Sequence, residues 1–360
     1  MNEAKQLIEQ LSARISPTDE TRRAEARRHL DDLTKPLGSL GRLEEIAAKM
    51  FAMRDGGMHA PMKKAVYVFA ADHGITAEGV SAYPSAVTRQ MVENFLAGGA
   101  AINVLGRAHG AAVHIVDVGV DADFNEHARL LHRKIRRGSR NMLRESAMSD
   151  AEVAAALAAG ASLGDSAAEE GVALLAIGEM GIGNTTAASA ITAALTGAPV
   201  PDITGRGTGL SEDAHQRKQT VIAAVLQRHF PRDGSVAPNA LEVLRCVGGL
   251  EIAAMAGMML AAAGQKIAIV IDGFISTAAA AVACALAPSA RDYMFAGHRS
   301  QEPGHRVLLE RLALRPILDL DMRLGEGTGA VLAMPILEAA VRIYTEMATF
   351  SSAGVSGAKP

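Results

Sequence analysis

A glutamate within a glycine-rich turn is the residue of this chain best suited to acid–base chemistry. Glu326 lies in the segment LGEGTGA at residues 324–330, which follows an apolar run at 316–322 and precedes a helical spacing of apolar residues up to 347. The apolar run indicates a short buried strand, so Glu326 is expected where a strand ends and a helix begins. Ligands of parallel α/β sheets bind at such corners, and flanking glycines let a ligand approach closely. An ordinary helix-capping acid is the alternative, since acids are common at helix starts.

A second glutamate repeats this arrangement. Glu179 lies in GEMGIGNTT at residues 178–186, between the apolar run 171–177 and an alanine-rich helical segment at 185–195. Two such corners in one chain predict one cleft that holds two carboxylates. The polar residues at the helix start can cap the helix or donate hydrogen bonds to an anion; they are Asn184, Thr185 and Thr186.

A third glycine-rich turn, GRGTG at residues 205–209, precedes a polar helix that carries Lys218. Backbone amides of the turn, together with the lysine, are suited to hold a phosphate or ribose. The alternative for Lys218 is a solvated position on an exposed helix face. None of the three turns is a Walker A loop or a GxGxxG turn, so neither of these nucleotide-binding families is supported.

Composition excludes several classes of protein. The 360 residues include 49% apolar and only 3% aromatic residues, no tryptophan, and a net charge of −3, which disfavours nucleic acid and anionic membranes as partners. Cys246 and Cys284 are the two cysteines, too few for a disulfide framework or a thiolate zinc site. No apolar run reaches the roughly 18 to 20 residues that span a bilayer, and no signal-peptide core is found at the start. A cytoplasmic protein is predicted.

The alternation of apolar runs with alanine-rich helical patterns from residue 61 onward predicts an α/β fold, with a parallel, Rossmann-like sheet flanked by helices. The expected strands are 65–70, 112–118, 172–177, 267–271, 292–296 and 316–322. A small helical domain built from both ends of the chain (residues 1–60 plus 335–360) is expected beside a large α/β catalytic domain (residues 61–334).

Three further polar segments have competing interpretations. Asp72-His73 is a poor metal site, because neighbouring residues on a strand point in opposite directions and no other cluster offers ligand spacing. Tyr83 lies in an expected loop, where it either flanks a planar ring or covers an apolar edge. The basic run at 132–140 is interpreted as a solvated loop or a surface that meets a partner subunit, rather than as a nucleic-acid site.

Six motifs together resemble one family, although each alone is weak. In order they are KPLGSLG (35–41), ADHG (71–74), GEMGIGNTT (178–186), GRGTG (205–209), HRSQEPG (298–304) and LGEGTG (324–329). Over residues 20–345 the chain resembles the nicotinate-nucleotide–dimethylbenzimidazole phosphoribosyltransferases of the cobalamin nucleotide-loop pathway. The resemblance implies a homodimer with a parallel sheet and a small helical domain from both termini.

The resemblance also implies the reaction, in which phosphoribose moves from nicotinate mononucleotide to 5,6-dimethylbenzimidazole. The general base of the family falls on Glu326. Burial in a glycine-walled cleft would raise the pKa of this glutamate. Glu179 would be the second carboxylate, and Lys218 would lie near the phosphoribosyl group. No cofactor and no metal are expected, because no Asp-Asp pyrophosphate motif occurs. The expected substrate-binding residues are Gly181, Gly183, Asn184, Thr185, Gly205, Gly207, Thr208, Gly209 and Ser300, and, for the planar acceptor, Ser81, Tyr83, Ser85 and Gln90.

Two other classes of protein remain as alternatives at this stage. A non-catalytic binding protein for nucleotides or cobamide precursors is disfavoured, because carboxylates repel phosphates unless they serve chemistry. A nicotinamide-dependent oxidoreductase would need a GxGxxG turn with an acidic residue about 20 positions further on, and the chain lacks this pattern.

Overall fold

A sheet of six parallel strands forms the centre of the protein. The computed structural model describes residues 2–54, 57, 59–207, 209–231 and 238–356. The strand order is β3-β2-β1-β4-β5-β6. Along the chain the strands are β1 (Lys64–Ala71), β2 (Ala111–Gly119), β3 (Leu130–His132), β4 (Leu174–Met180), β5 (Ala268–Ile271) and β6 (Met294–Ala296). The predicted α/β class with a parallel sheet is therefore confirmed.

Helices cover both faces of the sheet, as parallel sheets require. The first layer contains α6 (Asp150–Glu169), α11 (Leu250–Gly264) and α12 (Phe274–Leu286), and α11 packs against β1, β2, β4 and β5. On the other face α5 (Ala101–His109) packs on β2, and α14 (Thr328–Glu346) packs on β4 and β5. Almost every residue of α11 is buried, which explains its lack of a polar face.

Further elements surround the carboxyl ends of the strands or complete the layers. They are η1 (Gly74–Glu78), α4 (Ala86–Ala97), α7 (Asn184–Thr196), α8 (Val200–Ile203), α9 (Glu212–His229), α10 (Ala240–Val247), η2 (Pro288–Tyr293) and α13 (Pro303–Leu312). Helix α7 begins directly after β4 and packs against α8, α9, α10, α12 and α13. This packing places the start of α7 beside the third glycine-rich turn.

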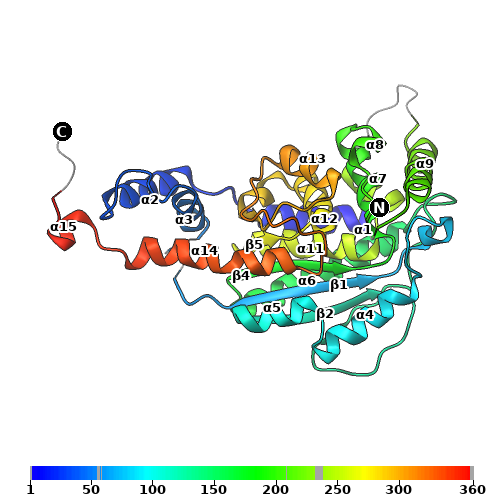
Figure 1. The fold of residues 1–360 in the computed structure, drawn as a ribbon, viewed down its shortest axis with the longest axis horizontal. Coiled ribbons are helices and arrows are strands. Elements are labelled where there is room, and N and C mark those ends of the chain that lie inside the picture. Colours follow the sequence, from blue (N-terminus) through cyan, green and yellow to red (C-terminus); the bar gives the residue numbers. More distant parts are fainter. Residues whose placement is uncertain (1, 55–56, 58, 208, 232–237, 357–360) are drawn as a thin grey trace.

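The two ends of the chain contribute helices at different places. Helices α2 (Glu20–Asp32) and α3 (Arg42–Ala52) pack together, and α3 packs on α14; with α15 (Phe350–Ala353) they project from the main body (Figure 1). An isolated bridge joins Leu33 to Thr349. Helix α1 (Asn2–Ala13) instead packs on α6 and α11. The expected boundaries near residues 60 and 335 stay a prediction, and α14 crosses the second of them without a break.

The structure corrects one expected strand and adds another. Residues 316–322 do not form a strand, since only Leu318 makes an isolated bridge, to His298. Asp321 has a φ of +55°, which is incompatible with an extended strand. Glu326 therefore follows an irregular segment and not a strand end. Strand β3, which consists of three residues at the sheet edge, had no expected counterpart.

Candidate active site

A cleft of about 490 Å³ opens at the carboxyl ends of the strands. It is formed by the end of β4 and the start of α7, the turn between β5 and α12, the loop after β6, and the segment before α14. Its lining residues are Tyr83, Val87, Met91, Glu179, Met180, Gly181, Ile182, Asn184, Thr185, Gly207, Gly273, Phe274, Ile275, Ser300, Glu302, Arg323, Leu324, Gly325 and Glu326. A smaller cavity of about 30 Å³ shares the turn at 181–185 and is also lined by Ser81 and Lys218. The three glycine-rich turns thus meet in one place.

Glu326 is held in an unusual backbone conformation at the start of α14. Its φ is +65°, and the residues on either side, Gly325 and Gly327, also have positive φ, at +83° and +88°. A side chain in this left-handed region costs free energy, and such positions cluster at functional sites. The turn also packs tightly on β4, because an added Cβ at Gly178 would clash with the backbone of Glu326.

The environment of the Glu326 carboxyl group favours its protonated form. Burial raises its pKa to about 7, and the charge of Asp272 acts in the same direction. Oε2 is buried and has no hydrogen-bond partner among the described residues. A carboxylate with a pKa near neutrality is well matched to accept a proton during catalysis.

Asp272 fixes the turn that carries Glu326. It follows β5, and its two carboxylate oxygens accept hydrogen bonds from the amides of Gly327 (3.1 Å) and Ala330 (3.0 Å). Burial raises the pKa of Asp272, whereas the nearby ring of His298, with Nε2 3.5 Å from Oδ1, opposes the rise. Because the first amides of a helix lack partners within the helix, Asp272 caps α14 from another element.

Glu179 is the second carboxylate of the cleft. It lies within β4, paired with Phe69 of β1, rather than in the turn after the strand as expected from sequence. Its Oε2 accepts a hydrogen bond from the side-chain amide of Asn184. Burial is the largest cause that raises the pKa of Glu179, to about 8, and the charges of Asp272 and Glu251 raise it further. The hydrogen bond from Asn184 acts in the opposite direction. At neutral pH this group therefore keeps its proton.

Lys218 is fully buried on α9, so the expected alternative of a solvated surface lysine is wrong. Packing of α9 against α7 brings its ammonium group to Thr185 Oγ1 (2.8 Å) and to the carbonyl oxygen of Gly205 (3.3 Å). Burial lowers the pKa of Lys218 to about 8, while the charge of Glu302 opposes this change. The lysine thus connects two of the glycine-rich turns and lines the smaller cavity.

The remaining expected residues are distributed unevenly around the cleft. Tyr83, Ser300, Gly181, Asn184, Thr185 and Gly207 line the larger cavity, and Ser81 and Gly183 line the smaller one. Ser85 and Gln90 are exposed, the first just before α4 and the second within its first two turns. Neither lines a cavity, and the same holds for Gly205 and Gly209. Thr208 lies outside the described residues.

Several lining residues escaped the sequence analysis as site residues. Glu302 directly precedes α13, is buried, and has an Oε2 without a hydrogen-bond partner among the described residues. Arg323 donates a hydrogen bond to the carbonyl oxygen of Gly207 (3.0 Å) and so joins the turn before α14 to the third glycine-rich turn. Met91 of α4 adds apolar surface. Glu302 belongs to the recognised HRSQEPG motif, so a signal for it was present, whereas nothing local marks Met91.

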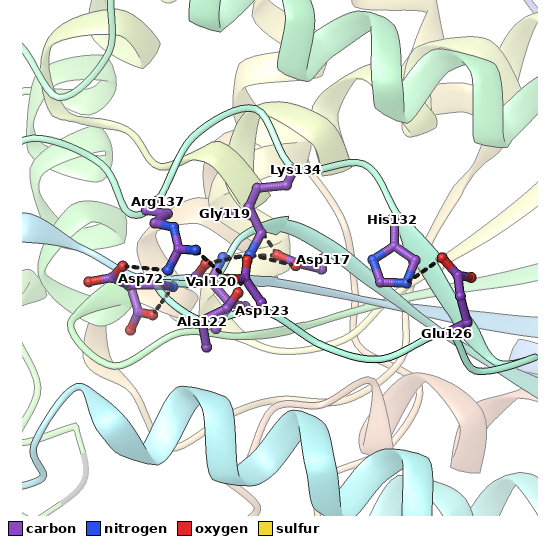
Figure 2. Close-up of polar contacts among 11 residues, drawn as sticks. Asp72, Asp117, Gly119, Val120, Ala122, Asp123, Glu126, His132, Lys134 and Arg137 are labelled. Atoms are coloured by element: carbon purple, nitrogen blue, oxygen red, sulfur yellow. Dashed lines mark hydrogen bonds and ion pairs between the residues drawn. The ribbon is translucent and has the colours of Figure 1, made fainter.

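The basic run at 132–140 is neutralised by acidic residues of the same chain. Figure 2 shows Lys134 beside Asp117 (3.1 Å) and Arg137 beside Asp123 (2.6 Å). Further along the run, Arg140 pairs with Glu152. These pairs weaken the positive field that attracts a nucleic acid.

Within residues covered by the structure, no group of three or more His, Cys, Asp or Glu side chains is arranged to hold a metal ion. None of the described helices is both long and apolar enough to cross a membrane.

Comparison with known proteins identifies first the class and then the family. The family model described as "Phosphoribosyltransferase" matches residues 15–355, so the chain is an enzyme of the glycosyltransferase type. A curated relative from Geobacter sulfurreducens is 52% identical over 97% of this chain and 98% of its own length. Another, from Chloroflexus aggregans, is 52% identical over 98% and 99%. Both are named nicotinate-nucleotide–dimethylbenzimidazole phosphoribosyltransferase.

A solved structure supports the same assignment. The crystal structure of the enzyme of that name from Thermus thermophilus superposes with a TM-score of 0.88 at 50% identity, covering 94% of this chain and all of that one. The chain belongs to the nicotinate-nucleotide–dimethylbenzimidazole phosphoribosyltransferase family. The resemblance found in the sequence motifs is thereby confirmed.

Proposed function

We propose that this protein transfers phosphoribose from nicotinate mononucleotide to 5,6-dimethylbenzimidazole, giving α-ribazole 5′-phosphate and nicotinate. The names of its relatives support the substrates. The observation that supports the chemistry best is a pair of buried carboxyl groups, Glu326 and Glu179, in one cleft at the carboxyl edge of the sheet.

The reaction exchanges one carbon–nitrogen bond for another at C1 of the ribose. A benzimidazole nitrogen forms the new bond, while the bond to the pyridinium nitrogen of nicotinate breaks and its electron pair returns to the pyridine ring. The leaving group needs no proton. The incoming benzimidazole must lose the proton from its other nitrogen, and Glu326 accepts it. A carboxylate whose pKa is about 7 does this efficiently at neutral pH.

Glu179 has a different role in this proposal. Burial raises its pKa to about 8, so Glu179 holds its proton near neutral pH. A protonated Glu179 orients the acceptor or the ribose by a hydrogen bond and adds no second negative charge. Neighbouring carboxyl groups whose pKa values differ commonly divide acid–base tasks in this way.

The phosphoribosyl group is assigned to the smaller cavity and the turns around it. Lys218, the hydroxyl of Thr185 and the amino end of α7 together form an anion site. Ser81 and the turns at 181–185 and 205–209 complete it, with Ser300 nearby. The planar acceptor is assigned to the apolar side of the cleft, formed by Tyr83, Val87, Met91 and Met180. Ser85 and Gln90 remain proposed neighbours of that ring.

A homodimer is also proposed, as the family resemblance implies. Large apolar side chains that are more than half exposed support it, namely Leu37, Leu320 and Leu324. Light scattering of the purified protein at several concentrations tests the state of association. A stable monomer across the range would refute it.

The test of the function is product analysis by mass spectrometry. Purified protein is mixed with nicotinate mononucleotide and 5,6-dimethylbenzimidazole, in parallel with Glu326→Gln and with Glu9→Gln, a change at an exposed position of α1. Ribazole phosphate and nicotinate are expected from wild type and Glu9→Gln, with a loss of about 100-fold or more in Glu326→Gln.

Two outcomes would change the proposal. Equal product from Glu326→Gln would keep the reaction and move the base to Glu179. No product from folded wild type, with other planar bases also supplied, would refute the transferase assignment. In that case a binding-only protein would account for the cleft.

A further inference from the structure

A buried ion pair lies directly behind the turn at 181–183. His73 follows β1, and Glu251 lies in the first turn of α11. His73 Nε2 and Glu251 Oε1 are 2.6 Å apart, and the two side chains are 1% and 0% exposed. Neither residue lines the cleft, and neither contacts a substrate in the transfer chemistry proposed above, although the charge of Glu251 contributes to the raised pKa of Glu179.

Glycines bring the imidazole ring against the turn. A Cβ added at Gly181, which lines both cavities, would lie 3.4 Å from His73 Cδ2 and Nε2. A Cβ added at Gly183 would lie 3.2 Å from His73 Cβ. A Cβ at Gly249, at the start of α11, would clash with the ring. The ring of His73 is therefore packed against both the turn at 181–183 and Gly249.

The charges of the pair keep it in one geometry. Burial lowers the pKa of His73, but the charge and hydrogen bond of Glu251 and the charge of Asp72 outweigh it, so the net pKa is raised. Separation of the two groups would leave a charge uncompensated in the interior, which is far more costly than keeping them together. The turn has one further side-chain anchor among the described contacts, the hydroxyl of Thr88, which accepts a hydrogen bond from the amide of Ile182 (3.1 Å).

We propose that the His73–Glu251 pair is a positioning unit that holds the turn at 181–183 in the shape that receives the phosphoribosyl group. This proposal deepens the proposed function and depends on it for the identity of the ligand. Neither residue touches the substrate. Their effect is exerted through the backbone of Gly181 and Gly183, so it should appear in donor affinity more than in acceptor affinity.

The test compares two substitutions of Glu251 with a control histidine. Glu251→Gln keeps an oxygen that can accept the hydrogen bond from His73, whereas Glu251→Leu fills the volume and removes the acceptor. His114→Gln is the control, because His114 stacks on Tyr67 (ring centroids 4.7 Å apart) in the amino-terminal half of β2. Steady-state kinetics measure kcat and the KM of each substrate, and hydrogen–deuterium exchange measures protection of the peptide that covers residues 181–185.

Glu251→Leu is expected to raise the KM for nicotinate mononucleotide about tenfold, with the KM for dimethylbenzimidazole changed less than about twofold. Exchange at 181–185 should accelerate, while peptides of β1 and α12 stay protected. Glu251→Gln should remain within about threefold of wild type, and His114→Gln should lower the Tm without changing either KM. If Glu251→Leu does not fold, His73→Asn, whose shorter amide does not reach Glu251, is expected to give the same kinetic pattern.

The double variant His73→Asn with Glu251→Leu should behave like either single variant, since two members of one unit are not additive. Additive effects, or equal rises in the two KM values, would overturn the proposal. Hydrogen–deuterium exchange at residues 181–185 that is unchanged from wild type would also overturn the proposal. Exchange that accelerates there in a protein without transferase activity would keep the positioning role and refute the proposed function instead.

Discussion

Replacement of Glu326 by glutamine should make the protein more stable at alkaline pH even as it removes the proposed base. The folded protein holds this carboxyl group with a pKa of about 7, against a usual value of 4.5, so the folded state binds the proton more tightly than the unfolded state does. This difference destabilises the folded state whenever the group must ionise. The destabilisation is absent below about pH 4.5, where both the folded and the unfolded states are protonated. It grows as the pH rises toward 7 and is complete above that value.

The size of the effect follows from the difference in pKa. A rise from 4.5 to about 7 corresponds to about 3 kcal/mol, because each pKa unit is worth about 1.4 kcal/mol. Glutamine has nearly the same shape and carries no charge, so it avoids this cost. For a chain of 360 residues that unfolds cooperatively, about 3 kcal/mol raises the Tm by about 4 °C.

Thermal unfolding at two pH values provides the assay. Wild type and Glu326→Gln are compared at pH 5 and at pH 8.5, with Glu9→Gln on the surface as the matched control. The variant is expected to exceed wild type by about 4 °C at pH 8.5 and by about 1 °C or less at pH 5, while Glu9→Gln follows wild type at both. A variant that is destabilised equally at both pH values would refute the reasoning, because burial would then not be raising the pKa of the carboxyl group in the folded protein.

Four other predictions concern the same site. The kcat/KM should rise with pH through about 7 as Glu326 loses its proton, and fall above about 8 as Lys218 loses its charge and Glu179 its proton, which a pH–rate profile measures. Lys218→Met should raise the KM for the donor about 10- to 100-fold, since a charged hydrogen-bond donor is lost; steady-state kinetics would show it. Gly178→Ala should lower stability by about 1–3 kcal/mol in urea unfolding, because its Cβ meets the backbone of Glu326. Asp272→Asn places an NH₂ group opposite one of two backbone donors, so one hydrogen bond that holds the turn of Glu326 is lost. The kcat/KM should then fall at least about tenfold, while circular dichroism shows that the fold is retained.

Local sequence patterns were sufficient for much of the fold. Strands β1, β2, β4, β5 and β6 were predicted to within about three residues at each end, because both faces of a parallel strand are buried and the apolar run is continuous. The segment 316–322 has a similar apolar content but forms no strand. Its two aspartates, Asp319 and Asp321, instead meet Arg299 and Gln301 in the loop after β6, a long-range arrangement that periodicity does not report.

The residues of the candidate site also differ in whether a local sequence pattern marks them. Glycine turns with an acidic residue are a local feature, so Glu326, Glu179 and the turns at 181–185 and 205–209 were visible in the sequence. The buried state of Lys218 depends on how α9 packs against α7, and its hydrogen bonds reach residues 13 and 33 positions away. A side chain on a polar helix has the same local pattern whether it faces water or a neighbouring helix.

The sequence by itself determined the class of fold and predicted the two carboxylates, because hydrophobic periodicity and the backbone freedom of glycine are properties of short segments. The family followed from the resemblance of six motifs taken in order. Only the tertiary structure decided the protonation of those carboxyl groups and the contacts that hold their segments in place. Asp272 reaches Gly327 across 55 positions, and His73 reaches Glu251 across 178. Burial and charge act through space, so the pKa of a group depends on neighbours that are distant in the chain.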